Sequence, residues 1–133
     1  MHASINWLAT IVAALSAFAV GGIWYSPKVF CNPWMKDSKL TQEELRAGNQ
    51  ARIFGFTALF SLIMAINLAM FLNDPKTTIA WGATAGFLAG IWGFCAIAIH
   101  SLFELRPWRH IIINGGYSIV SMTVMGAIIG AWR

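Results

Sequence analysis

Two ionisable side chains stand four residues apart where a long apolar stretch of the sequence ends. His100 and Glu104 have the i, i+4 spacing that puts two side chains on one face of a helix. Ionisable groups at the edge of a membrane-spanning segment are rare and costly, so each is a candidate functional group. We expect His100 to bind a ligand or relay a proton, with Glu104 holding either His100 or Arg106.

Polar side chains of the next apolar stretch are expected at the same depth in the membrane as His100. His100 is three residues from the end of its stretch and Asn114 three residues from the start of the next, each ~4.5 Å along its helix. In two antiparallel helices these side chains reach the same level, near one face of a membrane. The predicted binding cluster comprises His100, Glu104, Asn114, Tyr117, Tyr25, Ser26, Arg52 and Arg106.

The remaining cysteines and histidines show no spacing typical of a metal or haem site. Cys31 and Cys95 are isolated, with no C-x-x-C pair, and His100 and His110 are ten residues apart across a turn. A haem would require axial histidines well inside facing helices. We therefore expect no bound metal and no cofactor, and we assign no catalytic residue.

The composition indicates the class of protein that carries these side chains. Hydrophobic residues make up 58% of the 133 residues and charged residues only 11%. Soluble domains carry about a quarter charged residues, and a soluble chain this apolar would expose large patches and aggregate. The sequence therefore predicts an integral membrane protein, with the lipid bilayer as its surroundings.

Four apolar runs contain no Asp, Glu, Lys or Arg and are each long enough for a helix to cross a bilayer. They show no alternation of apolar and polar residues, which argues against barrel strands. Ala17-Phe18-Ala19 has the form of a signal-peptidase site, but no basic residue precedes it and the apolar run continues to Trp24. We predict an all-α polytopic membrane protein, a single domain over residues 1–133, with four transmembrane helices in an antiparallel bundle at about 5–25, 53–72, 79–103 and 111–132.

Basic residues predict the orientation of the bundle. Seven of the nine lie in the connections 26–52 and 104–110, and only Lys76 and Arg133 lie on the other side. Cytoplasmic connections carry the excess of Lys and Arg, so we expect both basic connections in the cytoplasm and both termini outside. This describes a multi-pass protein of the cell membrane, the inner membrane in a bacterium. The net charge of +4 is then a topology signal and does not indicate nucleic-acid binding.

The long connection over residues 26–52 has its own predicted order. Pro27 ends the first helix, and an apolar stretch with Phe30 and Trp34 then lies at the interface or folds back onto the bundle. Thr41 and Glu44 have the spacing of a capping box, which predicts a short amphipathic cytoplasmic helix over residues 42–52. This helix could continue into the second transmembrane helix.

Glycines recur every fourth residue in the third and fourth runs. Small residues at this spacing let the backbones of membrane helices approach closely. The glycines pack either two helices of one chain or two copies of the chain against each other. We expect a homo-oligomer, because a four-helix protein with little outside the membrane often needs partners. The predicted packing residues are Gly82, Gly86, Gly90, Gly126 and Gly130.

Several of these segments together resemble one known family. The first half carries Trp24-Tyr25-Ser26-Pro27, then Phe30, Trp34-Met35 and residues 41–45. The second half carries residues 100–104, Ile113-Asn114-Gly115-Gly116-Tyr117, Met125-Gly126 and Trp132. The chain resembles the small, mainly bacterial membrane proteins catalogued as domain of unknown function 1761. Cys31 departs from that family's pattern, where a Gly would follow the Phe. The resemblance implies four membrane helices and no assigned activity.

Three classes of function fit these observations. The first is binding or transport of a small solute or a proton through the polar cluster. The second is a structural or accessory membrane subunit that acts by helix packing, in which His100 and Glu104 only lock a turn. The third is a membrane enzyme on a lipid-like substrate, with His100 and Glu104 as an acid–base pair. We rank binding or transport first and the enzyme last.

Overall fold

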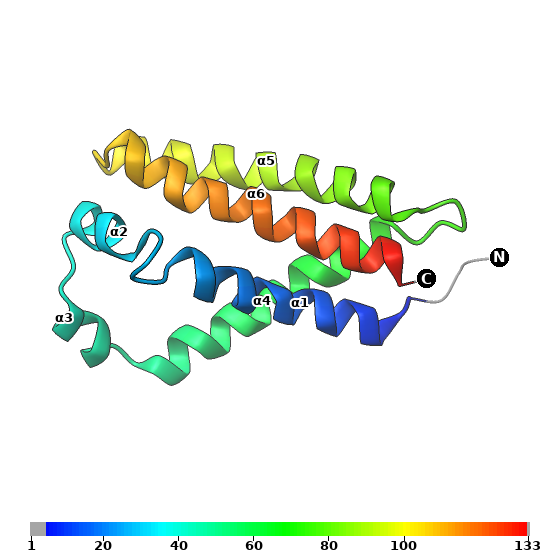
Figure 1. Cartoon of the computed structure of the whole chain (residues 1–133), viewed down its shortest axis with the longest axis horizontal. Coiled ribbons are helices and arrows are strands. Elements are labelled where there is room, and N and C mark those ends of the chain that lie inside the picture. Colours follow the sequence, from blue (N-terminus) through cyan, green and yellow to red (C-terminus); the bar gives the residue numbers. More distant parts are fainter. Residues whose placement is uncertain (1–4, 133) are drawn as a thin grey trace.

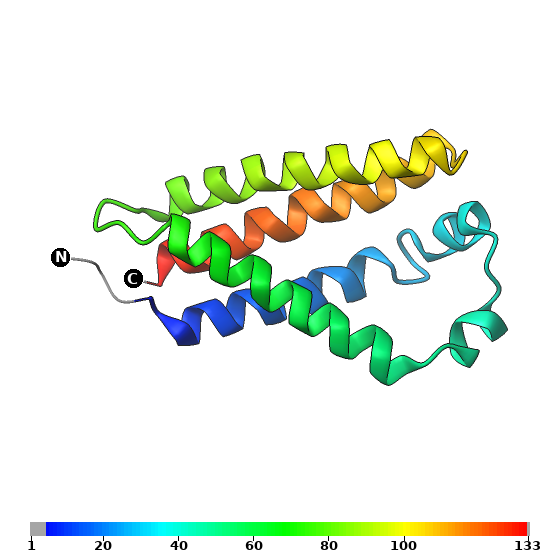
Figure 2. The same cartoon turned by 180° about the vertical axis from the view of Figure 1, so that it is seen from behind.

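The computed structural model describes residues 5–132, and this part of the chain is helical with no strand. The helices are α1 (Trp7–Trp24), α2 (Cys31–Ser38), α3 (Gln42–Ala47), α4 (Gln50–Phe71), α5 (Ile79–Phe103) and α6 (Trp108–Ala131). Four of them, α1, α4, α5 and α6, are long and apolar enough to cross a membrane. Figures 1 and 2 show these four running lengthwise, with α2 and α3 together at one end. The prediction of an all-α polytopic membrane protein is confirmed.

Helices α5 and α6 form a hairpin whose backbones touch. A methyl group added at Gly82 would overlap the carbonyl oxygen of Gly126, and one at Gly86 would overlap the carbonyl oxygen of Met122. A methyl group at Gly90 would also overlap the backbone, at Cα of Ile119. The glycine row of α5 therefore packs against α6 of the same chain. A homo-oligomer stays a prediction, and it would have to use another face.

Helix α6 is the centre of the molecule. Eleven of its residues are buried, against four or five in each of α1, α4 and α5. It contacts α5 along its length, α1 on a second side and α2 near its start. At its end, the Asn6 side chain donates a hydrogen bond to the carbonyl oxygen of Trp132 at 3.1 Å and so ties α1 to α6.

Helix α4 packs on the others through only one half. Ser61, Ala65, Leu68 and Ala69 are buried, whereas residues 50–60 are all exposed. Helix α4 crosses α1 and then diverges toward the end of the molecule where α2 and α3 lie (Figure 2). The four helices thus form an open bundle in which α4 and α5 separate along most of their length.

The connection between α1 and α4 differs from the predicted single helix over residues 42–52. Helix α3 ends at Ala47, and α4 begins at Gln50 with Asn49 as its cap, accepting a hydrogen bond from the Arg52 N–H at 3.1 Å. The Thr41 hydroxyl accepts from the Glu44 N–H, as the capping-box spacing predicted, and donates to the Glu44 carboxylate. The apolar stretch before it forms α2, which folds back onto α6. We call the end of the bundle formed by residues 25–52 and 104–110 the basic end.

Candidate functional site

A chain of three polar side chains joins α1 to α6 at the basic end. Tyr25, the residue after α1, donates its hydroxyl proton to Oδ1 of Asn114 at 2.7 Å. Nδ2 of Asn114 lies 3.1 Å from Nε2 of His110, one turn earlier on α6. We call His110, Asn114 and Tyr25 the His110 cluster.

The direction of these hydrogen bonds determines which ring nitrogen of neutral His110 carries the proton. Because Oδ1 of Asn114 accepts from Tyr25, the amide nitrogen is the group that donates to His110. Nε2 therefore accepts, and in the neutral imidazole the proton sits on Nδ1. His110 is only 8% exposed, and Nδ1 is buried without a hydrogen-bond partner among the described residues. A buried N–H donor without a hydrogen-bond partner lowers the free energy of unfolding by about 1–3 kcal/mol relative to a paired donor.

Aromatic rings pack around Tyr25 and hold its hydroxyl in place. The ring of Tyr25 lies 5.7 Å from the ring of Trp34 on α2 and 5.6 Å from the ring of Tyr117 on α6. The Tyr117 hydroxyl donates to the carbonyl oxygen of Ala17 at 2.8 Å. The Trp24 indole donates to the carbonyl oxygen of Ile113 at 2.8 Å. The end of α1 is thus fastened to α6 on both sides of the cluster.

Helix α2 covers this region through Asp37. Arg109 holds the Asp37 carboxylate with two hydrogen bonds, of 2.8 Å to Oδ2 and 2.6 Å to Oδ1. Arg106 donates to the backbone oxygen of Asp37 at 2.9 Å. The hydrogen bond from the Arg109 guanidinium holds the pKa of Asp37 below its usual value. This bidentate pair clamps the end of α2 over the first turn of α6.

The structure brings together only some of the predicted site residues. Tyr25, Asn114 and Tyr117 meet, and Arg106 reaches α2. Ser26 makes backbone hydrogen bonds in the turn after α1, and Arg52 is exposed in the first turn of α4, away from the cluster.

His100 and Glu104 stand outside the cluster. Both are exposed, and neither side chain has a hydrogen-bond partner among the described residues. The neighbouring Ser101 is buried and faces α6. One residue turns a helix by about 100°, so the exposed His100 lies to the side of the face that packs on α6. The face of α5 on which His100 lies could not be deduced from its depth.

The histidine that joins the cluster, His110, is not among the binding residues predicted from the sequence. His110 precedes the predicted fourth run, and α6 begins two residues earlier, at Trp108. The available signal was its i, i+4 spacing to Asn114, which puts both side chains on one face of α6.

These features define a class of protein: a small α-helical membrane protein with an open four-helix bundle and a partly buried polar cluster at one end. The chain belongs to the family described as protein of unknown function DUF1761, whose model matches residues 8–130. No curated protein and no solved structure matches the chain.

Proposed function

We propose that the chain binds a proton or a small hydrogen-bonding solute at the His110 cluster and takes part in its movement across the membrane. The observation that carries this proposal is the buried Nδ1 of His110, which has no partner among residues 5–132. An oxygen acceptor of a solute or a water molecule would complete the hydrogen bonds of the neutral imidazole.

Protonation of His110 would change the hydrogen bonds to Asn114 and Tyr25. In the imidazolium both ring nitrogens donate, so Nε2 can no longer accept from the Asn114 amide. The amide would have to turn its oxygen toward His110 and its nitrogen toward the Tyr25 oxygen. The Tyr25 hydroxyl proton must then find a new acceptor. One proton at His110 would therefore reverse the direction of the whole chain of hydrogen bonds.

The charges near the cluster favour placing it on the cytoplasmic side of a cell membrane. Seven Lys and Arg residues lie in the two connections at the basic end, and Lys76 lies at the opposite end. With this orientation the His110 cluster lies near the cytoplasm, and both termini lie outside.

A flux assay with two histidine variants tests the proposal. We expect purified protein in liposomes that enclose a pH-sensitive dye to carry protons under an imposed pH gradient. His110→Gln removes the titrating ring, so it should abolish this flux. His100→Gln removes an exposed ring outside the cluster, so it should leave the flux unchanged. Equal proton flux in the two variants, or no proton flux above empty liposomes for the original chain, would refute proton transport through the His110 cluster.

A further inference from the structure

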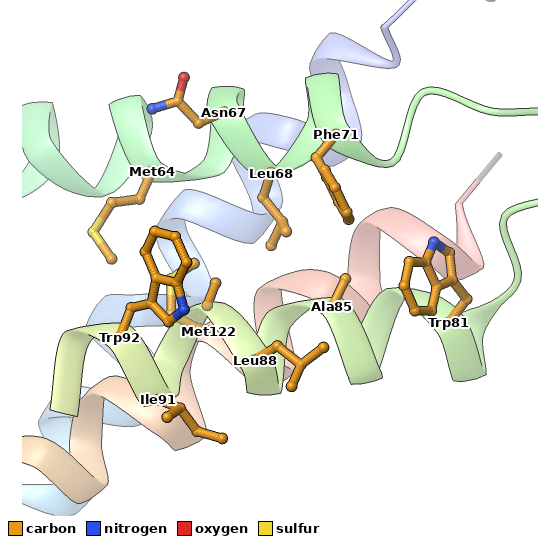
Figure 3. A pocket seen from close by; sticks show the side chains of 11 residues that line it. Met64, Asn67, Leu68, Phe71, Trp81, Ala85, Leu88, Ile91, Trp92 and Met122 are labelled. Atoms are coloured by element: carbon orange, nitrogen blue, oxygen red, sulfur yellow. The ribbon is translucent and has the colours of Figure 1, made fainter. Parts of the chain in front are cut away.

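Helices α4 and α5 leave a groove between them in the part of the chain that crosses the membrane. Its cavity has a volume of about 610 Å³. Figure 3 shows Met64, Leu68 and Phe71 of α4 extending from one wall toward α5. The floor includes Leu68, Ala85 and Met122, which are only 5–6% exposed.

The groove extends over about half the thickness of a bilayer. On α5 its lining runs from Trp81 to Trp92, and the eleven steps between these residues span ~16 Å of helix. A hydrocarbon core is about 30 Å thick, so one leaflet accounts for about 15 Å. Trp81 lies in the first turn of α5, near the membrane surface opposite the basic end. The groove therefore runs from that surface to about the bilayer midplane.

Trp92 marks the inner end of the groove. It is 82% exposed and lies about halfway along α5. Interfacial tryptophans normally gather near the membrane surfaces, so an indole at the midplane needs another reason. In Figure 3 its ring stands beside Met64 of α4, across the opening between the two helices. Trp92 and Met64 thus form the inner boundary of the groove.

The shape and lining of the groove decide what can occupy it. A volume of about 610 Å³ over a length of ~16 Å corresponds to a width of roughly 7 Å. A transmembrane helix is about 10–12 Å across with its side chains, so it could lie over the groove but not inside it. The walls are almost entirely apolar, with Asn67 the one amide, which excludes a hydrated solute.

We propose that this groove, between Trp81 and Trp92, holds one acyl chain of a membrane phospholipid from the leaflet opposite the basic end. The headgroup lies at the level of Trp81 and Phe71, whose rings are 6.1 Å apart, and the chain ends at Trp92 and Met64. The lipid is bound in place and does not exchange as freely as the lipids around the other helices. This site is independent of the His110 cluster, which lies at the other end of the bundle.

Photolabelling in vesicles tests the site. The full chain is reconstituted into phosphatidylcholine vesicles with a trace of phosphatidylcholine that carries a diazirine in one acyl chain. After irradiation, the labelled residues are located by mass spectrometry. We expect the label to concentrate on the groove faces of α4 and α5. Label spread evenly over exposed side chains elsewhere, such as Leu15 and Ile99, would mean ordinary lipid contact and would overturn the proposal.

Two alanines of α5 provide a matched pair of variants. Ala89→Phe places a ring in the groove, so it should lower labelling at Met64 several-fold, because the ring fills the space that the acyl chain occupies. Ala96→Phe adds the same ring on an exposed position outside the groove and should leave the labelling unchanged. Unchanged labelling in Ala89→Phe would refute the site.

A second variant covers the case in which Ala89→Phe misfolds. Trp92 is so exposed that Trp92→Ala should keep the helical circular dichroism of the original chain. Loss of the indole should lower labelling at Met64 several-fold, because the inner boundary is then missing. Unchanged labelling would contradict the proposal. A Trp92→Cys variant that forms a disulfide between two chains in high yield would instead show that a second copy covers the groove.

Discussion

At the scale of the residue, a few contacts at the basic end attach α2 to α6. Asp37 is the clearest case, because its carboxylate takes two hydrogen bonds from Arg109 while its backbone oxygen takes one from Arg106. Its side chain is only 7% exposed, although the partner guanidinium is half exposed. A bidentate pair of this kind fixes both distance and orientation. The charge of this carboxylate therefore helps to hold α2 over the His110 cluster, together with the Arg106 bond to the backbone and the contact of the Trp34 and Tyr25 rings.

This dependence predicts an effect of pH on α2. The pKa of Asp37 is lower in the folded chain than in an unfolded one, where it is about 3.9. The stability from the ion pair is therefore fully present above the unfolded pKa and is lost as the pH falls through the folded pKa. We expect α2 to leave α6 only in strong acid. Asp37→Asn should release it at neutral pH.

The half-buried thiol of Cys31 in α2 reports this release. Its rate of reaction with a maleimide should rise in Asp37→Asn at pH 7. Glu43→Gln, which removes an exposed carboxylate of α3, should react at the rate of the original chain. If the two variants react equally fast, the ion pair does not hold α2 in place.

At the scale of the elements, the close approach of α5 and α6 is the main constraint on how the helices are arranged. Apolar side chains gain little by leaving lipid for a protein interior, so membrane helices associate through close packing of small residues. Gly82 and Gly86 of α5 meet backbone atoms of α6 directly, without a side chain between them. The hairpin then supplies the rigid support on which α1 and α2 pack.

A glycine comparison tests this constraint. Gly86→Ala should destabilise the fold by about 1–3 kcal/mol, because the methyl group overlaps the Met122 carbonyl and forces the helices apart. Gly55→Ala in α4 has open space around the new methyl group. Alanine also favours helix, so that variant should be neutral or more stable by up to about 1 kcal/mol. Unfolding by a denaturing detergent measures both. A Gly86→Ala variant as stable as Gly55→Ala would show that the contact is not tight.

At the scale of the whole molecule, the even number of spans puts the ends of the described chain on one side. Asn6 and Trp132 are in hydrogen-bond contact at the end opposite α2 and α3. The basic end and the end with the termini therefore face opposite sides of the membrane.

Labelling from outside the cell tests the proposed orientation. In a Cys31→Ser background, Lys76→Cys should react with a membrane-impermeant maleimide on intact cells. Lys39→Cys should react only after the membrane is opened, because the proposed orientation places the basic connections in the cytoplasm. The reverse pattern would invert the orientation and would place the His110 cluster near the outer surface.

The sequence by itself determined the number of membrane segments and the ends of α5. These follow from local properties, because a run of about 20 apolar residues without charge has few structures open to it in a bilayer. It also determined that the glycines of α5 mediate close packing, although not with which helix.

Only the tertiary structure decided which histidine joins the polar cluster and where the bundle stays open. His100 and His110 lie at similar depths, and the choice between them depends on the rotation of each helix about its axis. That rotation is set by the contact of Gly82, Gly86 and Gly90 with α6. The gap between α4 and α5 likewise results from how α4 crosses α1. Both are relations between segments far apart in sequence, and no local pattern of residues encodes them.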